Sequence, residues 1–219
     1  MKSSKSTRLE EPFMAEITFT TEASLHRDYG GENFVHEITG RISIRNTADE
    51  TEETAGELRV WLIQFIEAQA HGISSRVLGD GYTLELRRYW QELFDFDELK
   101  PEIQKAWQTD GSDLLVIRSI QILDRFQDQG IGLAAVARTI DLFSRSCDLV
   151  ACLPEAMEES LDSEILSSGA MRSQADRQHM RKAISVLVRD LRAAGFRALG
   201  ETGLYLLNPT YERPHVLLE

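Results

Sequence analysis

The stretch that decides the fold is LLVIRSIQILDRFQDQGIGLAAVARTIDLF, residues 114–143. It opens with an apolar run at Leu114–Leu123, which is typical of a central strand buried on both faces. A short loop with Gly130 and Gly132 follows, and the apolar spacing after the loop predicts a helix over residues 131–146. The segment is therefore predicted to run from strand through loop to helix.

The C-terminal part adds a second buried strand, predicted at Leu149–Leu153 and ended by Pro154. A strand, a helix and a strand in this order are typical of a crossover unit with parallel strands. A helix is predicted at Gln178–Ala194, with Gly195 as its C-terminal cap. The remaining elements expected in this part are a short helix at Glu155–Leu166 and a closing hairpin of Phe196–Leu199 and Gly203–Leu207.

The N-terminal part has the alternation of antiparallel strands. Ala15–Thr20 and Val35–Asn46 alternate apolar and polar residues, and Gly40 is the expected site of a bulge. The acidic residues 47–54 are predicted to form a solvated loop, and Leu58–Ile66 to form the next strand. Helices are expected at Tyr82–Phe96, where apolar residues recur at steps of three and four, and from Pro101 to Trp107.

Composition indicates one globular domain. The chain has 219 residues, of which 42% are hydrophobic, enough for a core without disulfides or metal. Residues 1–12 are expected to be a flexible tail, and residues 13–219 a single domain with an insertion at 154–175 that could serve as a lid or a dimer contact. Cys147 and Cys152 adjoin apolar stretches and are predicted to be buried thiols, which suits a reducing, cytoplasmic location.

The net charge of −12 bears on partners. A field of that sign repels phosphate backbones and anionic lipid, so nucleic acid and membrane partners are not expected. It attracts cationic acceptors such as amines or basic peptides, although an acidic surface also serves solubility alone. The five histidines have no ligand spacing and no cysteine or carboxylate cluster beside them, so no metal site is predicted.

The loop before residue 131 has the features of an anion site. The first turn of a helix has backbone N–H groups without partners, and the helix dipole places partial positive charge there. Glycines let a phosphate approach those groups closely. A P-loop is excluded because no Gly-Lys-Ser/Thr follows, and a dinucleotide fingerprint lacks its first glycine because residue 127 is Gln.

Gln127-x-x-Gly130-x-Gly132 resembles the Gln/Arg-x-x-Gly-x-Gly/Ala motif of the GNAT N-acetyltransferases, and the order of elements over about residues 113–208 is similar to that superfamily. The resemblance implies an α/β (α+β) fold with a mixed, mostly antiparallel central sheet, a splayed parallel pair and flanking helices. It also implies acetyl-CoA, or another acyl-CoA, as co-substrate. The residues it places around this cofactor are Ile122, Leu123, Gln127, Gln129, Gly130, Ile131, Gly132 and Leu133.

The implied reaction is transfer of an acetyl group to an amine by direct attack. The backbone N–H near Leu123 would stabilise the oxyanion. The family's general-acid Tyr has no counterpart, because Leu191 stands at that position, so Tyr205 is the substitute candidate. Asp124 and Asp113 are the candidate bases, at the end and the start of the central strand.

Two other interpretations stay open. The chain could be a GNAT-fold module that binds CoA, or nothing, and acts through protein contacts. It could also be a plain α/β domain whose Gly130–Gly132 turn is structural. The family's first helices lie between its first two strands, whereas here the clearest helix lies just before the central strand. The N-terminal half is therefore expected to diverge.

Overall fold

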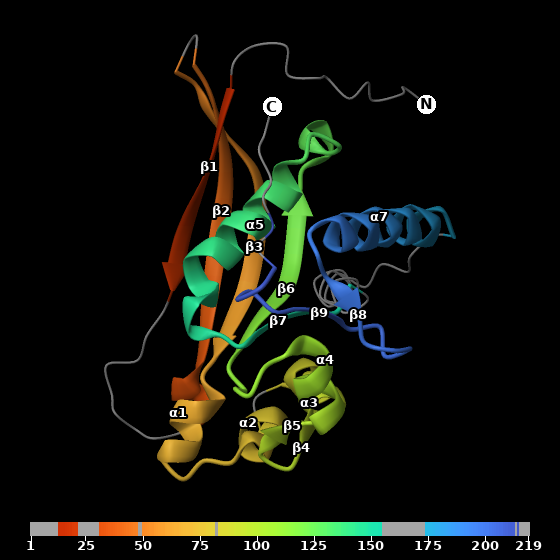
Figure 1. Ribbon diagram of the computed structural model, residues 1–219. Helices are drawn as coiled ribbons and strands as arrows, with labels where there is room; N and C mark the ends of the chain where they lie inside the picture. The colour runs from red at the N-terminus through yellow and green to blue at the C-terminus, as the bar shows by residue number, and fades with distance from the viewer. Residues whose placement is uncertain are drawn as a thin grey trace.

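The computed structural model describes residues 13–21, 31–47, 50–81, 83–154, 174–212 and 214, and its strands form one seven-stranded sheet and one two-stranded ribbon (Figure 1). The large sheet has the order β1-β2-β3-β6-β7-β9-β8, so both halves of the chain share it. Its strands are β1 Phe13–Thr21, β2 Val35–Asn46, β3 Glu52–Ile63, β6 Leu114–Ile122, β7 Leu149–Cys152, β8 Arg197–Ala198 and β9 Tyr205–Leu207.

The pairing confirms a mixed, mostly antiparallel sheet. Every neighbouring pair is antiparallel except β6 and β7, which run parallel with Leu114 opposite Leu149. Helix α5, Ile131–Phe143, connects these two strands. The predicted strand-helix-strand unit is therefore present.

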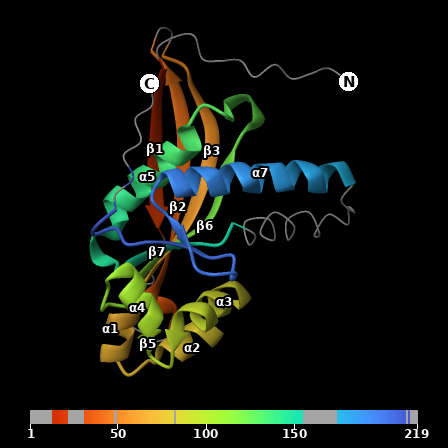
Figure 2. The same cartoon turned by 45° about the vertical axis from the view of Figure 1, so that its right-hand side comes forward.

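The central strand contributes to two hydrophobic clusters because successive side chains point to opposite faces. Leu114 and Val116 belong to the cluster that includes the helices before β6, whereas Leu115 and Ile117 belong to the cluster with α5. Helix α7, Gln174–Ala193, shares the face of α5 and crosses the sheet in Figure 2. Both cysteines are buried, as predicted.

Four helices lie between β3 and β6 and pack together at one end of the sheet (Figure 1). Sequence reasoning predicted only the last two, and it wrongly assigned Phe65 and Ile66 to a strand. The first two helices were missed because each spans only a turn or two, which is too short for a periodic pattern to stand out. The elements are α1 Phe65–Ala70, α2 Ser75–Gly81, α3 Leu84–Leu93, the ribbon of β4 Phe94–Asp95 and β5 Glu98–Leu99, and α4 Pro101–Trp107.

The expected bulge at Gly40 is wrong. Gly40 pairs regularly with Leu58, and the register between β2 and β3 shifts at Ile42/Ser43 instead. A Cβ atom on Gly40 would lie 2.8 Å from Cδ1 of Ile17, so the glycine makes room for a side chain of the neighbouring strand. The acidic loop is also shorter than expected, because β3 already begins at Glu52.

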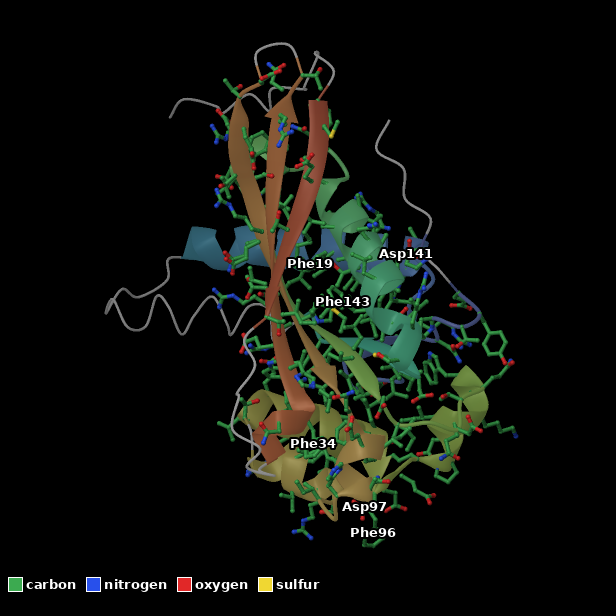
Figure 3. All side chains as sticks on the ribbon, turned by 90° about the vertical axis from the view of Figure 1, so that its left-hand side faces the viewer. Phe19, Phe34, Phe96, Asp97, Asp141 and Phe143 are labelled. Atoms are coloured by element: carbon green, nitrogen blue, oxygen red, sulfur yellow. The ribbon has the colours of Figure 1, made fainter. Side chains whose placement is uncertain are left out.

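Helix α5 is anchored to the sheet on one side. The rings of Phe143 and Phe19 of β1 meet edge to face, with centroids 4.9 Å apart (Figure 3). At the end of α7, Gly195 has φ +95°, and the N–H of Phe196 bonds the carbonyl of Leu191 at 3.0 Å. Gly195 therefore caps this helix as predicted.

Three predictions fall wholly or mostly outside the described residues: the tail at 1–12, the short helix at 155–166, and the insertion at 154–175, of which residues 155–173 are not described. Within the described part of the chain, no helix has the length and apolar character needed to cross a membrane.

The starts of β6 and β7 are joined by two aspartates. The N–H of Asp113 donates to Oδ2 of Asp148 at 2.9 Å, and the N–H of Asp148 donates to the Asp113 carbonyl at 2.9 Å. Burial raises the pKa of both carboxyl groups, and the charges of Asp148 on Asp113 and of Asp110 on Asp148 raise them further.

We expect Asp148→Asn to raise the free energy of unfolding at pH 7 by about 0.5 kcal/mol, a figure kept small because the carboxyl group is half exposed to solvent. The folded protein binds the proton of Asp148 more tightly than the unfolded chain, so wild-type stability rises as pH falls through the raised pKa. Urea unfolding at pH 7 and pH 4.5 should show the variant's advantage shrinking at the lower pH. Asp95→Asn, at an exposed position, is the control. An advantage that is constant with pH would contradict the prediction.

Candidate functional site

Strand β6 has a partner on both sides over only half its length. It pairs with β3 from Leu114 to Ile122, but with β7 only from Leu114 to Ile117. We call the place where the strands part, after Ile117 and Cys152, the fork. We call the side of Arg118–Ile122 that faces away from β3 the open edge, because no described strand pairs with it.

A bulge lies at the fork. Val60 pairs with Ile117 and Arg59 with Ser119, so Arg118 is an extra residue in β6. A bulge bends its strand and increases the local twist. β7 ends at Cys152, so past this bulge no described strand continues beside β6 on the side away from β3.

The hydrogen bonds to β3 fix which amides reach the open edge. The N–H of Leu123 donates to the carbonyl of Ala55 at 2.9 Å, in register with the pairing of Ile122 and Gly56. Backbone groups of antiparallel strands alternate in direction. The N–H groups of Ile120 and Ile122 therefore face the open edge.

This alternation corrects the expected oxyanion donor. The amide of Leu123 is engaged within the sheet and is not available to a ligand. The sequence predicted Leu123 as the donor, but the direction of each amide depends on the register with β3, which the sequence does not show.

Two glutamines brace the loop between β6 and α5. Nε2 of Gln127 donates to the carbonyl of Ile122 and to Oδ1 of Asp124, both at 3.1 Å, and Nε2 of Gln129 donates to the carbonyl of Arg125 at 3.2 Å. The predicted cofactor residues Gln127 and Gln129 therefore shape the loop through its own backbone. Asp124 is exposed and receives one of these bonds.

Helix α5 begins directly after this loop. Gly130 is its N-cap with φ +76°, a conformation that favours glycine, and the first helical bond runs from the N–H of Ala134 to the Gly130 carbonyl at 3.0 Å. The N–H groups of Ile131, Gly132 and Leu133 hence have no acceptor within the helix. We call these three amides the anion site, after the function that the sequence predicts for them.

The anion site adjoins the open edge. A Cβ atom on Gly132 would lie 3.4 Å from Cδ1 of Ile120 and 3.4 Å from Cγ1 of Ile122. The first turn of α5 thus packs on the two residues whose N–H groups face the open edge. Six of the predicted cofactor residues, Ile122, Gln127, Gly130, Ile131, Gly132 and Leu133, lie in this one place.

The predicted catalytic side chains are not all brought here. Tyr205 pairs with Cys152 at the fork, is 9% exposed, and accepts a hydrogen bond from Arg192 at 3.3 Å. Asp113 lies at the opposite end of β6, about 30 Å from Ile122 at roughly 3.3 Å per residue. Its Oδ1 accepts the N–H of Ile66 at 2.9 Å, so it is a structural residue and not a base for this site.

Sequence reasoning missed a polar group on the opposite face of the fork. Arg118 forms ion pairs with Glu37 and Glu85 and lies over the ring of Trp61. A lone charge inside the apolar run Leu114–Leu123 was the available signal, since buried strands rarely contain an arginine without a partner. In the part of the chain that the structure describes, no group of three or more His, Cys, Asp or Glu could hold a metal ion.

We expect Gln127→Ala to loosen the loop, because it removes both hydrogen bonds of the amide group. The amide of Phe126, which bonds the Leu123 carbonyl at 2.8 Å, should exchange with solvent several-fold faster by hydrogen-exchange mass spectrometry. Gln121→Ala, an exposed substitution on β6, should leave this exchange unchanged. Equal exchange in both variants would mean that Gln127 does not hold the loop.

Comparison with known proteins gave no matching family model, no similar curated protein and no similar solved structure. The function of the chain is therefore inferred from its own site.

Proposed function

We propose that the chain binds acetyl-CoA at the anion site and along the open edge, and that it transfers the acetyl group to an amine as a GNAT-type N-acyltransferase. One observation carries this proposal: a helix start whose three amides have no partner among the described residues packs directly on a strand edge whose two outward amides have none there either. The first suits a pyrophosphate. The second suits the amide groups of pantetheine, which can pair with a strand edge as a peptide does.

The order of the two parts matches the ligand. The anion site lies beside Ile122, and the fork begins at Arg118, about 13 Å away at roughly 3.3 Å per residue. With the pyrophosphate at α5, the pantetheine arm follows β6 and its thioester arrives at the fork. The N–H of Ile122 then pairs with the arm, and the N–H of Ile120 points toward the thioester.

The reaction needs few groups. A neutral amine attacks the thioester carbon, an N–C bond forms, and the carbonyl oxygen becomes an oxyanion that the N–H of Ile120 stabilises. The C–S bond then breaks. One proton leaves the nitrogen and one reaches the sulfur, so an amide and CoA thiol result.

A CoA-binding module without catalysis is the second candidate. Leu191 stands where the family has its general-acid tyrosine. It is 1% exposed and packs in the hydrophobic cluster between the sheet and helices α5 and α7. It offers no proton. Tyr205 lies nearby, and its hydroxyl accepts a bond from Arg192, which leaves its own O–H free to donate.

Calorimetry with acetyl-CoA on two variants of Gly130 tests the site. Asn and Asp tolerate φ +76° better than other side chains, and they differ in charge but hardly in size. We expect Gly130→Asp to bind acetyl-CoA about tenfold or more weakly than Gly130→Asn, because its carboxylate repels the pyrophosphate. Equal affinity, with equal melting temperatures, would remove the anion site from the proposal.

Release of CoA across a panel of amines separates the two candidates. Binding with CoA release supports the acyltransferase. Binding without release from any amine leaves the module, and absence of binding rejects both.

A further inference from the structure

Arg118 is the centre of a polar cluster made from four elements. Its Nη1 lies 3.0 Å from Oε1 of Glu37 on β2, and its Nη2 and Nε lie 3.0 and 3.2 Å from Oε2 of Glu85 on α3. The guanidinium carbon sits 3.7 Å from the ring centroid of Trp61 on β3. Opposite charges and an aromatic face together make a preferred setting for a cation.

Arg118 places the cluster beside the fork, on the face away from α5, with Trp61 and Glu37 on the β3 and β2 side of β6. Arg118 follows Ile117, the last residue of β6 that pairs with β7. Trp61 packs with the side chains of α1–α4, not with those of α5 and α7. A thioester that reaches the fork from the anion site therefore has this cluster on its far side.

Tyr89 of α3 brings a buried hydroxyl to the same place. The residue is 1% exposed, and its hydroxyl has no hydrogen-bond partner of normal geometry among the described residues. Burial raises its pKa well above the usual value, as do Cys152 and Glu85, while the backbone of Leu153 and the charge of Arg118 lower it. The hydroxyl thus stays protonated and lies among groups at the end of β7 and in the cluster.

Such a hydroxyl destabilises the fold, because a buried polar group without a well-formed hydrogen bond has lost its bonds to water. Phenylalanine would fill the same volume without that cost. A ligand that accepts or donates a hydrogen bond at the fork gives the hydroxyl its partner.

The charge balance selects the ligand. Two carboxylates face one guanidinium, and the side chain of Glu37 is 46% exposed. Because two carboxylates surround one guanidinium, the group has a net negative charge and would repel an anionic ligand. A second cation can share an oxygen of the exposed carboxylate, and the net charge of −12 favours its approach.

We infer that Glu37, Glu85 and Arg118 over Trp61, with the hydroxyl of Tyr89 beside them, form the acceptor site, and that the acceptor is a primary amine with a second positive charge. The inference rests on the proposed function, because it places the acceptor beside the acetyl group that this function brings to the fork. One amine attacks while the charged end is held by the carboxylates.

Three probes of similar size test the acceptor class. Putrescine has a cationic second end, butylamine has none, and γ-aminobutyrate has an anionic one. With acetyl-CoA present, CoA release should show the highest kcat/KM for putrescine, and calorimetry in the presence of CoA should show the tightest binding for the same amine. Preference for butylamine or γ-aminobutyrate would overturn the inference.

Matched variants locate the site. Glu37→Gln should raise KM for putrescine about fivefold, because the variant lacks the carboxylate charge that holds the second cationic end. KM for butylamine should stay unchanged, because butylamine has no second charge. Glu57→Gln, on the neighbouring strand and paired with Arg59, should change neither. An equal response of the two variants would overturn the assignment.

Tyr89→Phe separates function from packing. Loss of a hydroxyl that makes no hydrogen bond of normal geometry with the described residues should leave the melting temperature equal or higher, while kcat/KM for putrescine falls about tenfold. Unchanged kcat/KM would remove Tyr89 from the site.

The inference and the proposed function fail in different ways. Wild-type protein that does not bind acetyl-CoA overturns both. Wild-type protein that binds acetyl-CoA and acetylates neutral amines as well as putrescine overturns only the acceptor class.

Discussion

The bulge at Arg118 controls the geometry of the site. Up to Ile117, β6 is an interior strand with hydrogen bonds to both neighbours; beyond it, the strand keeps only β3. Interior strands have no spare backbone groups, so a ligand could not bind them. The extra residue lies where β7 ends, and beyond it no described strand receives the amides of Ile120 and Ile122.

The loop after β6 places the start of α5 against this edge. Gly130 adopts a left-handed conformation that starts the helix, and the small Gly132 lets the first turn pack on Ile120 and Ile122. Hydrogen bonds from Gln127 and Gln129 to the loop's backbone hold its shape. The partial positive charge of a helix start and the outward amides of a strand edge thus lie within a few residues of each other.

The same bulge residue links the two faces of the sheet. Its backbone opens the edge on which the cofactor is proposed to lie, and its side chain reaches Glu37 and Glu85 on the face of α3. The helices α1–α4 between β3 and β6 supply Glu85 and Tyr89 to this face.

The sequence by itself determined the elements with strong periodicity. Local patterns predicted three elements, because each depends only on residues close to it in sequence: the strand at Leu114–Leu123, the helix after Gly130 and the cap at Gly195. The short helices α1 and α2 did not, since they hold too few residues for a period to appear. The role of Gly40 was misread because this glycine makes room for the side chain of Ile17, which belongs to another strand.

Only the tertiary structure decided which groups are available at the site. The register with β3 places the N–H of Leu123 on the carbonyl of Ala55 and directs the N–H of Ile122 away from β3. A one-residue change in register would reverse the directions of these two N–H groups. It also brought Glu37, Glu85 and Arg118 together from distant parts of the chain. Pairing between strands far apart in sequence sets both outcomes, and no local pattern records it.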